Sequence, residues 1–157
     1  MQTLSRLQRN FTHQKTLTKL LLLAGLILFY PPLSSLYPLL PPLTGIAYLQ
    51  WRNHMYERDY LLIGAWMLYA VVLEAEWGLP LYGLWGTMFF LYFFLEPKIE
   101  HYIHSPWLVD MLAAALFDLL YFLFVIFYGA LVHQRFIEAD PILWYYLLID
   151  MMGAILF

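Results

Sequence analysis

The sequence predicts an all-α, polytopic membrane protein whose single domain, 1–157, forms a bundle of six spans. The composition supports this, because 63% of the residues are hydrophobic, only 12% are charged and the mean hydropathy is +0.67. A soluble domain carries about a quarter charged residues. The pattern supports it too, because apolar runs alternate with short charged segments, and about 20 apolar residues cross a bilayer core of about 30 Å. The chain has no cysteine, which excludes disulfides and cysteine-ligated metal or haem.

The basic residues predict the orientation of the spans. Lys and Arg are retained on the cytoplasmic side of a membrane. With the N-terminus inside, seven of the eight basic residues fall in cytoplasmic flanks and one outside. The seven are Arg6, Arg9, Lys15, Lys19, Arg52, Arg58 and Lys98, and the eighth is Arg135. Both termini are therefore expected in the cytoplasm, with 1–16 as a cytoplasmic N-terminal segment.

The first span is expected at about 17–30. A cleavable signal peptide is the alternative interpretation of this region. Tyr30-Pro31-Pro32 is not a small-residue cleavage site, however, and the apolar run leads straight into further hydrophobic sequence. The segment is therefore interpreted as an uncleaved first helix.

The second span, about 33–51, is expected to be short and distorted by proline. Five prolines lie between residues 31 and 42, and proline interrupts helical hydrogen bonding. A regular helix should begin near Pro41 or Pro42 and run through Trp51, which is about 10 residues or roughly 15 Å. Residues 33–40 then either continue the span as a distorted turn buried in the bundle or make it re-entrant. The charge pattern favours a full crossing, because the segment after Trp51 must return to the cytoplasm.

The other spans follow from uninterrupted apolar runs. They are expected at about 60–76, 80–96, 106–132 and 141–157. The connecting loops are short: Gln50–Asp59 and Glu96–Ser105 inside, Glu74–Pro80 and His133–Asp140 outside. None is long enough to form a soluble catalytic domain.

Two acids lie near the middle of spans. Asp118 is close to the midpoint of the fifth run and Asp150 to that of the sixth. A charge at the bilayer centre costs about 2.5–3.5 kcal/mol on insertion scales, so such residues face a bundle interior or water. A proton relay, a substrate ligand and a polar contact with a partner helix are the functional interpretations. The simpler interpretation is that each hydrogen-bonds inside its own bundle, with Tyr121, Tyr145 and Tyr146 as candidate partners.

A third acid, Asp110, lies one turn into the fifth helix, where a carboxylate suits the N-terminal dipole. Capping is enough to explain its position. No metal site is expected, because His101 and His104, near Glu96 and Glu100, are interpreted as part of an exposed loop. Nucleophile patterns and glycine-rich phosphate loops are missing from the sequence. The chain is therefore not expected to be an enzyme, to hold a cofactor or to bind nucleic acid.

The end of the third span carries the most specific pattern. Glu74 and Glu76 are followed by Gly78, which permits a tight reversal, and by Pro80, which suits the start of the fourth helix. Taken alone, the stretch is an acidic, solvated turn. An acid at its lip can also accept hydrogen bonds from the backbone of the turn.

This stretch resembles the bacterial rod-shape-determining protein family MreD over about residues 41–95. The family pattern is a glycine, three aliphatic residues and an acid, then a glycine, a Leu-Gly pair and a helix with a late tyrosine. The matching residues are Ala70-Val71-Val72-Leu73-Glu74, Gly78, Leu79-Pro80-Leu81-Tyr82-Gly83 and Tyr92, with Pro41-Pro42-Leu43 through Tyr48-Leu49-Gln50-Trp51 upstream. Ala70 replaces the glycine, Glu74 replaces the usual aspartate, and one residue is inserted before Gly83.

The resemblance implies a non-enzymatic scaffold of the cell-elongation machinery in the bacterial inner membrane. It implies a bitopic MreC-like partner bound by helix packing, and through it an MreB-like actin and a RodA-like glycosyltransferase with its transpeptidase. The bundle would be similar to the substrate-binding subunits of ECF vitamin transporters. Glu74, Gly78, Pro80 and Gly83 become structural or partner-binding candidates. The alternative is a small-molecule transporter or solute-binding membrane subunit, with the two intramembrane aspartates flanking a cavity.

Overall fold

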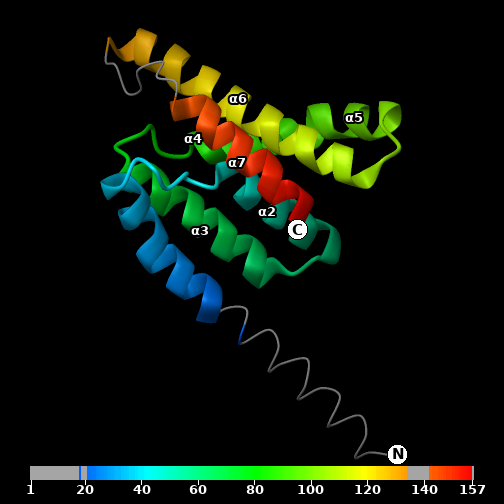
Figure 1. Ribbon diagram of the computed structural model, residues 1–157, viewed down its shortest axis with the longest axis horizontal. Coiled ribbons are helices and arrows are strands. Elements are labelled where there is room, and N and C mark those ends of the chain that lie inside the picture. Colours follow the sequence, from blue (N-terminus) through cyan, green and yellow to red (C-terminus); the bar gives the residue numbers. More distant parts are fainter. Residues whose placement is uncertain (1–17, 19–20, 134–141, 157) are drawn as a thin grey trace, which may run out of the picture.

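The computed structural model describes residues 18, 21–133 and 142–156 of the 157-residue chain. In these ranges the backbone forms helices joined by short connections, and none of it is in a strand. The predicted all-α class is confirmed. Figure 1 shows the helices stacked side by side, with the chain turning back at each short connection.

The helix bounds coincide with the predicted ranges where the apolar runs are long. An N-terminal helix, Leu21–Leu36, comes first. The following elements are α2 (Thr44–Glu57), α3 (Tyr60–Glu76), α4 (Gly83–Phe90), a π-helical segment η1 (Leu91–Leu95), α5 (Glu96–Tyr102), α6 (Pro106–Val132) and α7 (Ile142–Leu156). Helices α3, α6 and α7 match the expected spans to within a residue. Among the described residues, α6 is the one helix long and apolar enough to cross a membrane by itself, with a mean hydropathy of 2.2 over 18 residues.

The proline-rich region differs from the prediction. The N-terminal helix continues through Pro31 and Pro32 to Leu36, rather than ending at residue 30. Proline's fixed φ is itself helical, and two adjacent prolines confine the missing hydrogen bonds to one turn. The Ser34 hydroxyl also donates to the carbonyl of Pro31 over 2.9 Å. The break instead falls at residues 37–43.

Helix α2 also ends later than expected. It begins at Thr44, close to the predicted start, but continues past Trp51 to Glu57. Most of the expected Gln50–Asp59 loop is therefore helix, and α2 is about 21 Å long at 1.5 Å per residue. The extension is possible because the charged residue after Trp51 is paired inside the bundle, as described below.

The fourth predicted span, 80–96, is likewise replaced by a longer helical stretch that starts at Gly83 and runs through η1 and α5 to Tyr102. The π-helical segment η1 ends two residues before Pro97. Proline cannot donate a backbone hydrogen bond, and a π-turn is one of the recognised ways in which a helix absorbs such a fault. Most of the expected Glu96–Ser105 loop is therefore helical, and only residues 103–105 remain a loop.

Four tyrosine hydroxyls donate hydrogen bonds to the break at residues 37–43. They come from the N-terminal helix, from α3 and from α7, and each donates to a backbone carbonyl of the break. The pairs are Tyr30 to Pro41 (2.6 Å), Tyr69 to Pro42 (2.7 Å), Tyr145 to Leu39 (3.1 Å) and Tyr146 to Pro38 (2.6 Å). The irregular segment is thus tied to three surrounding helices.

Helix α2 lies at the centre of the bundle. It packs against α3, α6 and α7, while α6 and α7 pack along each other. Tyr48 and Trp51 of α2 are completely buried. The Tyr48 ring stacks on that of Phe117 in α6, with centroids 5.1 Å apart and planes 8° from parallel.

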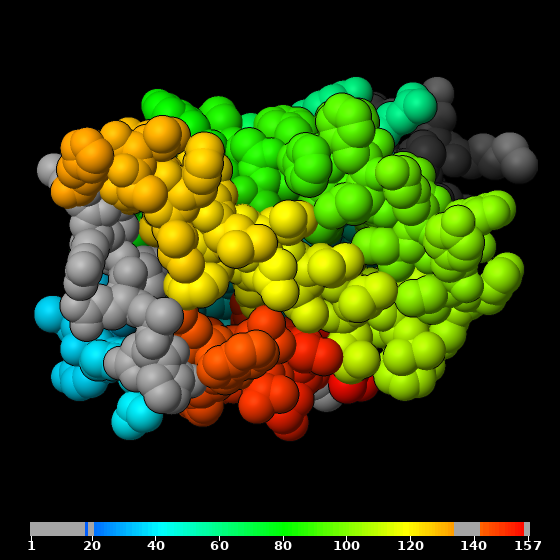
Figure 2. Space-filling model, turned by 90° about the horizontal axis from the view of Figure 1, so that it is seen from above, coloured from blue at the N-terminus to red at the C-terminus, as the bar shows by residue number. Residues whose placement is uncertain are grey.

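The outer faces of the helices are apolar. Figure 2 looks onto the face where α6 runs across the molecule with α7 beside it. Large apolar side chains more than half exposed occur on every one of the longer outer helices. They include Leu22, Leu28 and Phe29; Leu61 and Leu68; Phe93 and Phe94; Leu123, Phe127 and Leu131; and Trp144, Leu148 and Met152.

Gly45 is a position where α2 packs closely against α6 and α7. A Cβ atom there would lie 3.1 Å from Ala114 Cβ and 3.2 Å from the Ala114 carbonyl oxygen. Because these neighbours are backbone or next to it, Gly45→Ala should destabilise the fold by about 1–3 kcal/mol. Gly64, in α3, has nothing within 4 Å, so Gly64→Ala should be neutral or stabilising by up to about 1 kcal/mol. Unfolding of both variants in mixed micelles with increasing SDS measures the difference, and equal stabilities would contradict this packing.

Candidate functional site

The turn after α3 is built around a buried carboxylate. Glu74, in the last turn of α3, is 0% exposed. Its two oxygens accept the backbone N–H groups of Tyr82 (2.7 Å) and Leu84 (2.6 Å) and the hydroxyl of Tyr121 (3.2 Å). The first N–H groups of a helix have no partner within that helix. Glu74 therefore caps α4 from a neighbouring helix, and the expectation that it belongs to a solvated turn is wrong.

The glycines of the pattern make this cap possible. Gly78 adopts φ +63°, the left-handed conformation that ends many helices. The N–H of Leu79 bonds to the Glu74 carbonyl (2.8 Å) and that of Gly78 to the Ala75 carbonyl (3.3 Å), which is the Schellman arrangement. At Gly83, an added Cβ would collide with the Phe124 ring and lie 3.1 Å from Glu74 Oε1.

The predicted site residues at this turn are thus brought together, with one change. Pro80 does not start the fourth helix, because α4 begins at Gly83 and residues 80–82 form a turn that closes from the Gly83 N–H to the Pro80 carbonyl (3.3 Å). The cap supplies a structural role for Glu74, Gly78 and Gly83. A direct contact between Glu74 and a partner protein does not fit, since its carboxylate is enclosed.

The two aspartates expected inside the membrane meet at the start of α2. Asp118, from α6, accepts the Thr44 hydroxyl (2.6 Å), and Asp150, from α7, accepts the backbone N–H of Gly45 (2.7 Å). The two carboxyl groups thus bond to adjacent residues at the start of the same helix. The N-terminal end of a helix carries a partial positive charge, so both carboxyls suit this position, and Asp150 caps α2 as Glu74 caps α4.

The hydrogen-bond donors to this pair differ from the tyrosines expected. Tyr121 donates to Glu74, and Tyr145 and Tyr146 donate to backbone carbonyls of the break before α2. One oxygen of each carboxyl, Asp118 Oδ2 and Asp150 Oδ1, has no hydrogen-bond donor among the described residues.

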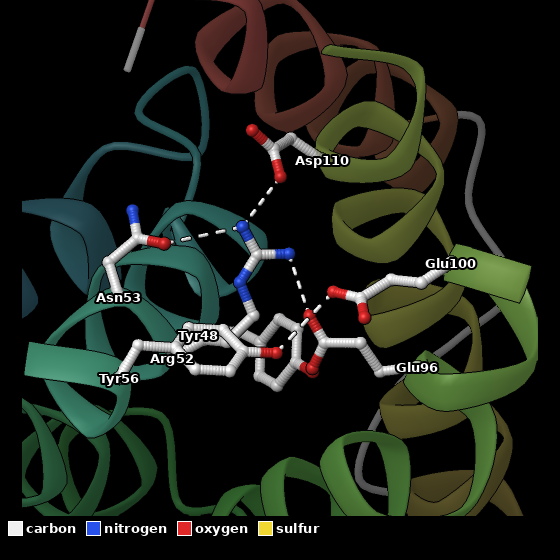
Figure 3. A network of polar contacts seen from close by, with 7 residues as sticks. All are labelled: Tyr48, Arg52, Asn53, Tyr56, Glu96, Glu100 and Asp110. Carbon is white, nitrogen blue, oxygen red and sulfur yellow. Dashed lines mark hydrogen bonds and ion pairs between the residues drawn. The ribbon is translucent and has the colours of Figure 1, made fainter. Parts of the chain in front are cut away.

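A second polar cluster joins α2, α5 and α6, and sequence reasoning missed it (Figure 3). Arg52, expected in a cytoplasmic flank, is 6% exposed. Its guanidinium donates to Glu96 Oε1 (2.7 Å) and to Asp110 Oδ1 (2.5 Å), and the Tyr48 hydroxyl donates to Glu96 Oε2 (2.7 Å). Asp110 therefore serves as an ion-pair partner rather than a helix cap, because its side chain points across to α2.

The rim of this cluster adds a weaker contact from α2 to α5. The Tyr56 hydroxyl donates to Glu100 Oε1 over 3.4 Å. Burial, together with the nearby carboxylates of Glu96 and Glu100, raises the pKa of Tyr56 to about 12, so it remains a donor at neutral pH. The contacts place the C-terminal half of α2, α5 and the first turns of α6 at one end of the bundle, and Figure 1 shows the α3–α4 turn at the other.

The residues considered for metal binding do not form a site. Within residues 21–133 and 142–156, no group of three or more His, Asp and Glu side chains is placed to hold a metal ion. Comparison of the chain with protein-family models, curated proteins and solved structures gives no match.

Arg52 is the single cation between two carboxylates, so its removal should be costly. Arg52→Ala leaves Glu96 and Asp110 without their counter-charge, and breaking a buried pair in this way costs about 3–5 kcal/mol. Arg58→Ala, at an exposed turn, removes the same charge and should change the free energy of unfolding by less than about 0.5 kcal/mol. Adding Glu96→Gln to Arg52→Ala should recover part of the loss. SDS-induced unfolding reports all three, and similar values for the two arginine variants would refute a supporting role for the cluster.

Proposed function

We propose that the chain forms a six-span bundle in the bacterial inner membrane, with both termini in the cytoplasm, and acts as a non-enzymatic scaffold of the rod complex. The main support for a membrane location is that the backbone carbonyls of the irregular segment 37–43 are hydrogen-bonded by side chains. Inside a bilayer, irregular backbone is tolerated only where protein satisfies it. Four tyrosine hydroxyls from three helices supply that pairing.

The distribution of side chains supports the same proposal. The charged groups Arg52, Glu74, Glu96 and Asp150 are at most 6% exposed, while the outer faces carry leucine, phenylalanine and tryptophan. Large contiguous apolar surfaces are a liability in water, whereas ionisable residues within a membrane face the bundle interior. Lipid is the solvent that this arrangement fits.

The second span can cross although α2 is only about 21 Å long. The preceding break extends it, with backbone carbonyls paired by tyrosine hydroxyls, and helices α3, α6 and α7 pack around α2 itself. The charge pattern agrees with this crossing, since Arg52, Arg58 and Lys98 belong to the end of the bundle that carries the α2–α5 contacts.

The scaffold assignment rests on the MreD-like pattern over residues 41–95. Its acid and glycines form one physical unit, in which Glu74 fixes where α4 begins. The outer side of α4 and η1 presents a ladder of phenylalanines at i,i+4 spacing: Phe89 packs on Phe93 and Phe90 on Phe94, with ring centroids 6.3 and 5.4 Å apart. We propose this aromatic ladder as the face for the single transmembrane helix of an MreC-like partner. MreB-like actin and a RodA-like glycosyltransferase with its transpeptidase would then be linked through that partner.

Co-purification with the MreC-like partner tests the scaffold. Glu74→Gln removes one hydrogen-bond acceptor from the cap of α4, and the lost hydrogen bond should cost about 1–1.5 kcal/mol. The amount of partner recovered should therefore fall by up to roughly tenfold. Phe94→Ala, at an exposed position (62%), should lower it without affecting the fold. Glu76→Gln, an exposed acid in the same turn, is the matched control and should behave as the wild type.

The same strains report cell shape, which should become rounded with Glu74→Gln and Phe94→Ala and stay rod-like with Glu76→Gln. Asp118→Asn should leave both readouts nearly intact. Undiminished partner recovery in Phe94→Ala would overturn the proposed face, and failure of the wild-type chain to retain the partner would overturn the scaffold itself.

A further inference from the structure

A cavity of about 560 Å³ lies beside α6 and α7. This volume is within the range of small-molecule sites, about 300–1,000 Å³. Its walls are mainly apolar and aromatic, with Leu73 from α3, Trp77 directly after that helix, Leu123 from α6 and Leu147 from α7. Such walls suit the body of an organic molecule.

One end of the cavity is polar. Asp118 lines it together with Thr44, and the Thr44 hydroxyl is already committed to Asp118 Oδ1. The second oxygen, Oδ2, is buried and has no donor among the described residues. Asp118 is therefore the carboxyl group that faces this end, and no lysine or arginine is among the described residues that line the cavity.

The other end opens towards the outer surface of the bundle. Leu123 and Trp144, on its rim, are 52% and 70% exposed and belong to the apolar faces of α6 and α7. Figure 2 shows the surface hollowed between these two helices. In a membrane-embedded bundle this opening faces the acyl chains, so a ligand would enter from the lipid.

The chemistry of the walls selects among ligands. A carboxylate ligand would be disfavoured beside the Asp118 carboxyl, and a purely apolar one would leave Asp118 Oδ2 unpaired, which is costly in a buried site. A primary ammonium group supplies the missing donors and the opposite charge. Trp77 and Trp144 offer aromatic faces that also attract cations.

We propose that this cavity is a binding site for a lipid-soluble primary amine, with the ammonium group on the Asp118 carboxylate and the apolar body between α6 and α7. The site does not depend on the scaffold role. It is formed by a different part of the bundle from the aromatic ladder.

Binding of 4-phenylbutylamine to the full-length chain in lipid nanodiscs tests the site, with 4-phenylbutanol and 4-phenylbutyrate as matched neutral and anionic probes. Tryptophan fluorescence, corrected with empty nanodiscs, follows binding. The amine should bind saturably and about tenfold or more tightly than the alcohol, and the acid should not bind. Asp118→Asn should weaken amine binding by about tenfold while leaving the alcohol within roughly twofold.

A second pair of variants tests the cavity without touching a carboxylate. Leu147→Trp fills the wall and should abolish saturable binding. Leu148→Trp, one residue on and 58% exposed, adds the same group outside the cavity and should bind as the wild type does. Equal signals for all three probes, or unchanged amine binding in Leu147→Trp, would overturn the site. Amine binding as tight in Asp118→Asn as in the wild type would overturn the role of the carboxylate.

Discussion

Helical hydrogen bonding is interrupted at residues 37–43 and again between α3 and α4. At both places, side chains from other helices form hydrogen bonds with the backbone groups that are left without a helical partner. Tyrosine hydroxyls pair the carbonyls of the first break, and carboxylates from Asp150 and Glu74 pair the N–H groups of the helices that follow. Each unpaired backbone group in an apolar medium costs several kcal/mol. The position of α2 and the direction of α4 both depend on this pairing.

The same requirement explains why charged residues are inside and leucines and phenylalanines outside. Once α2 is placed at the centre, Arg52 has no water to reach and must meet carboxylates from α5 and α6. The polar groups thereby specify which helices pack together, while lipid-facing positions need only be apolar. The cavity beside α6 and α7 is one place where this internal pairing stays incomplete, because Asp118 keeps an oxygen without a donor.

Long uninterrupted runs were enough to predict α3, α6 and α7 from the sequence. The bounds of α2 and α5 were not predictable in this way, because Arg52 and Glu96 each follow an apolar run and therefore resemble flanking charges. Their pairing joins residues 44 positions apart, which no local pattern records. The acid and glycines at the Glu74 turn did indicate a backbone-binding carboxylate, but burial of that carboxylate depends on Tyr121 and Phe124 of α6. The sequence placed Asp118 and Asp150 near the middle of neighbouring spans, but their meeting at the start of α2 and the cavity beside them depend on packing.

The membrane crossing of the bundle is the central claim, and cysteine labelling tests it directly, because the chain contains no cysteine. Single cysteines at Glu57, Glu76 and Lys98 occupy exposed positions at the two ends of the bundle. A membrane-impermeant maleimide applied to intact spheroplasts should label Glu76→Cys and reach Glu57→Cys and Lys98→Cys only after lysis. Labelling of Glu57→Cys and Lys98→Cys from opposite sides, or of all three from the same side, would contradict the account.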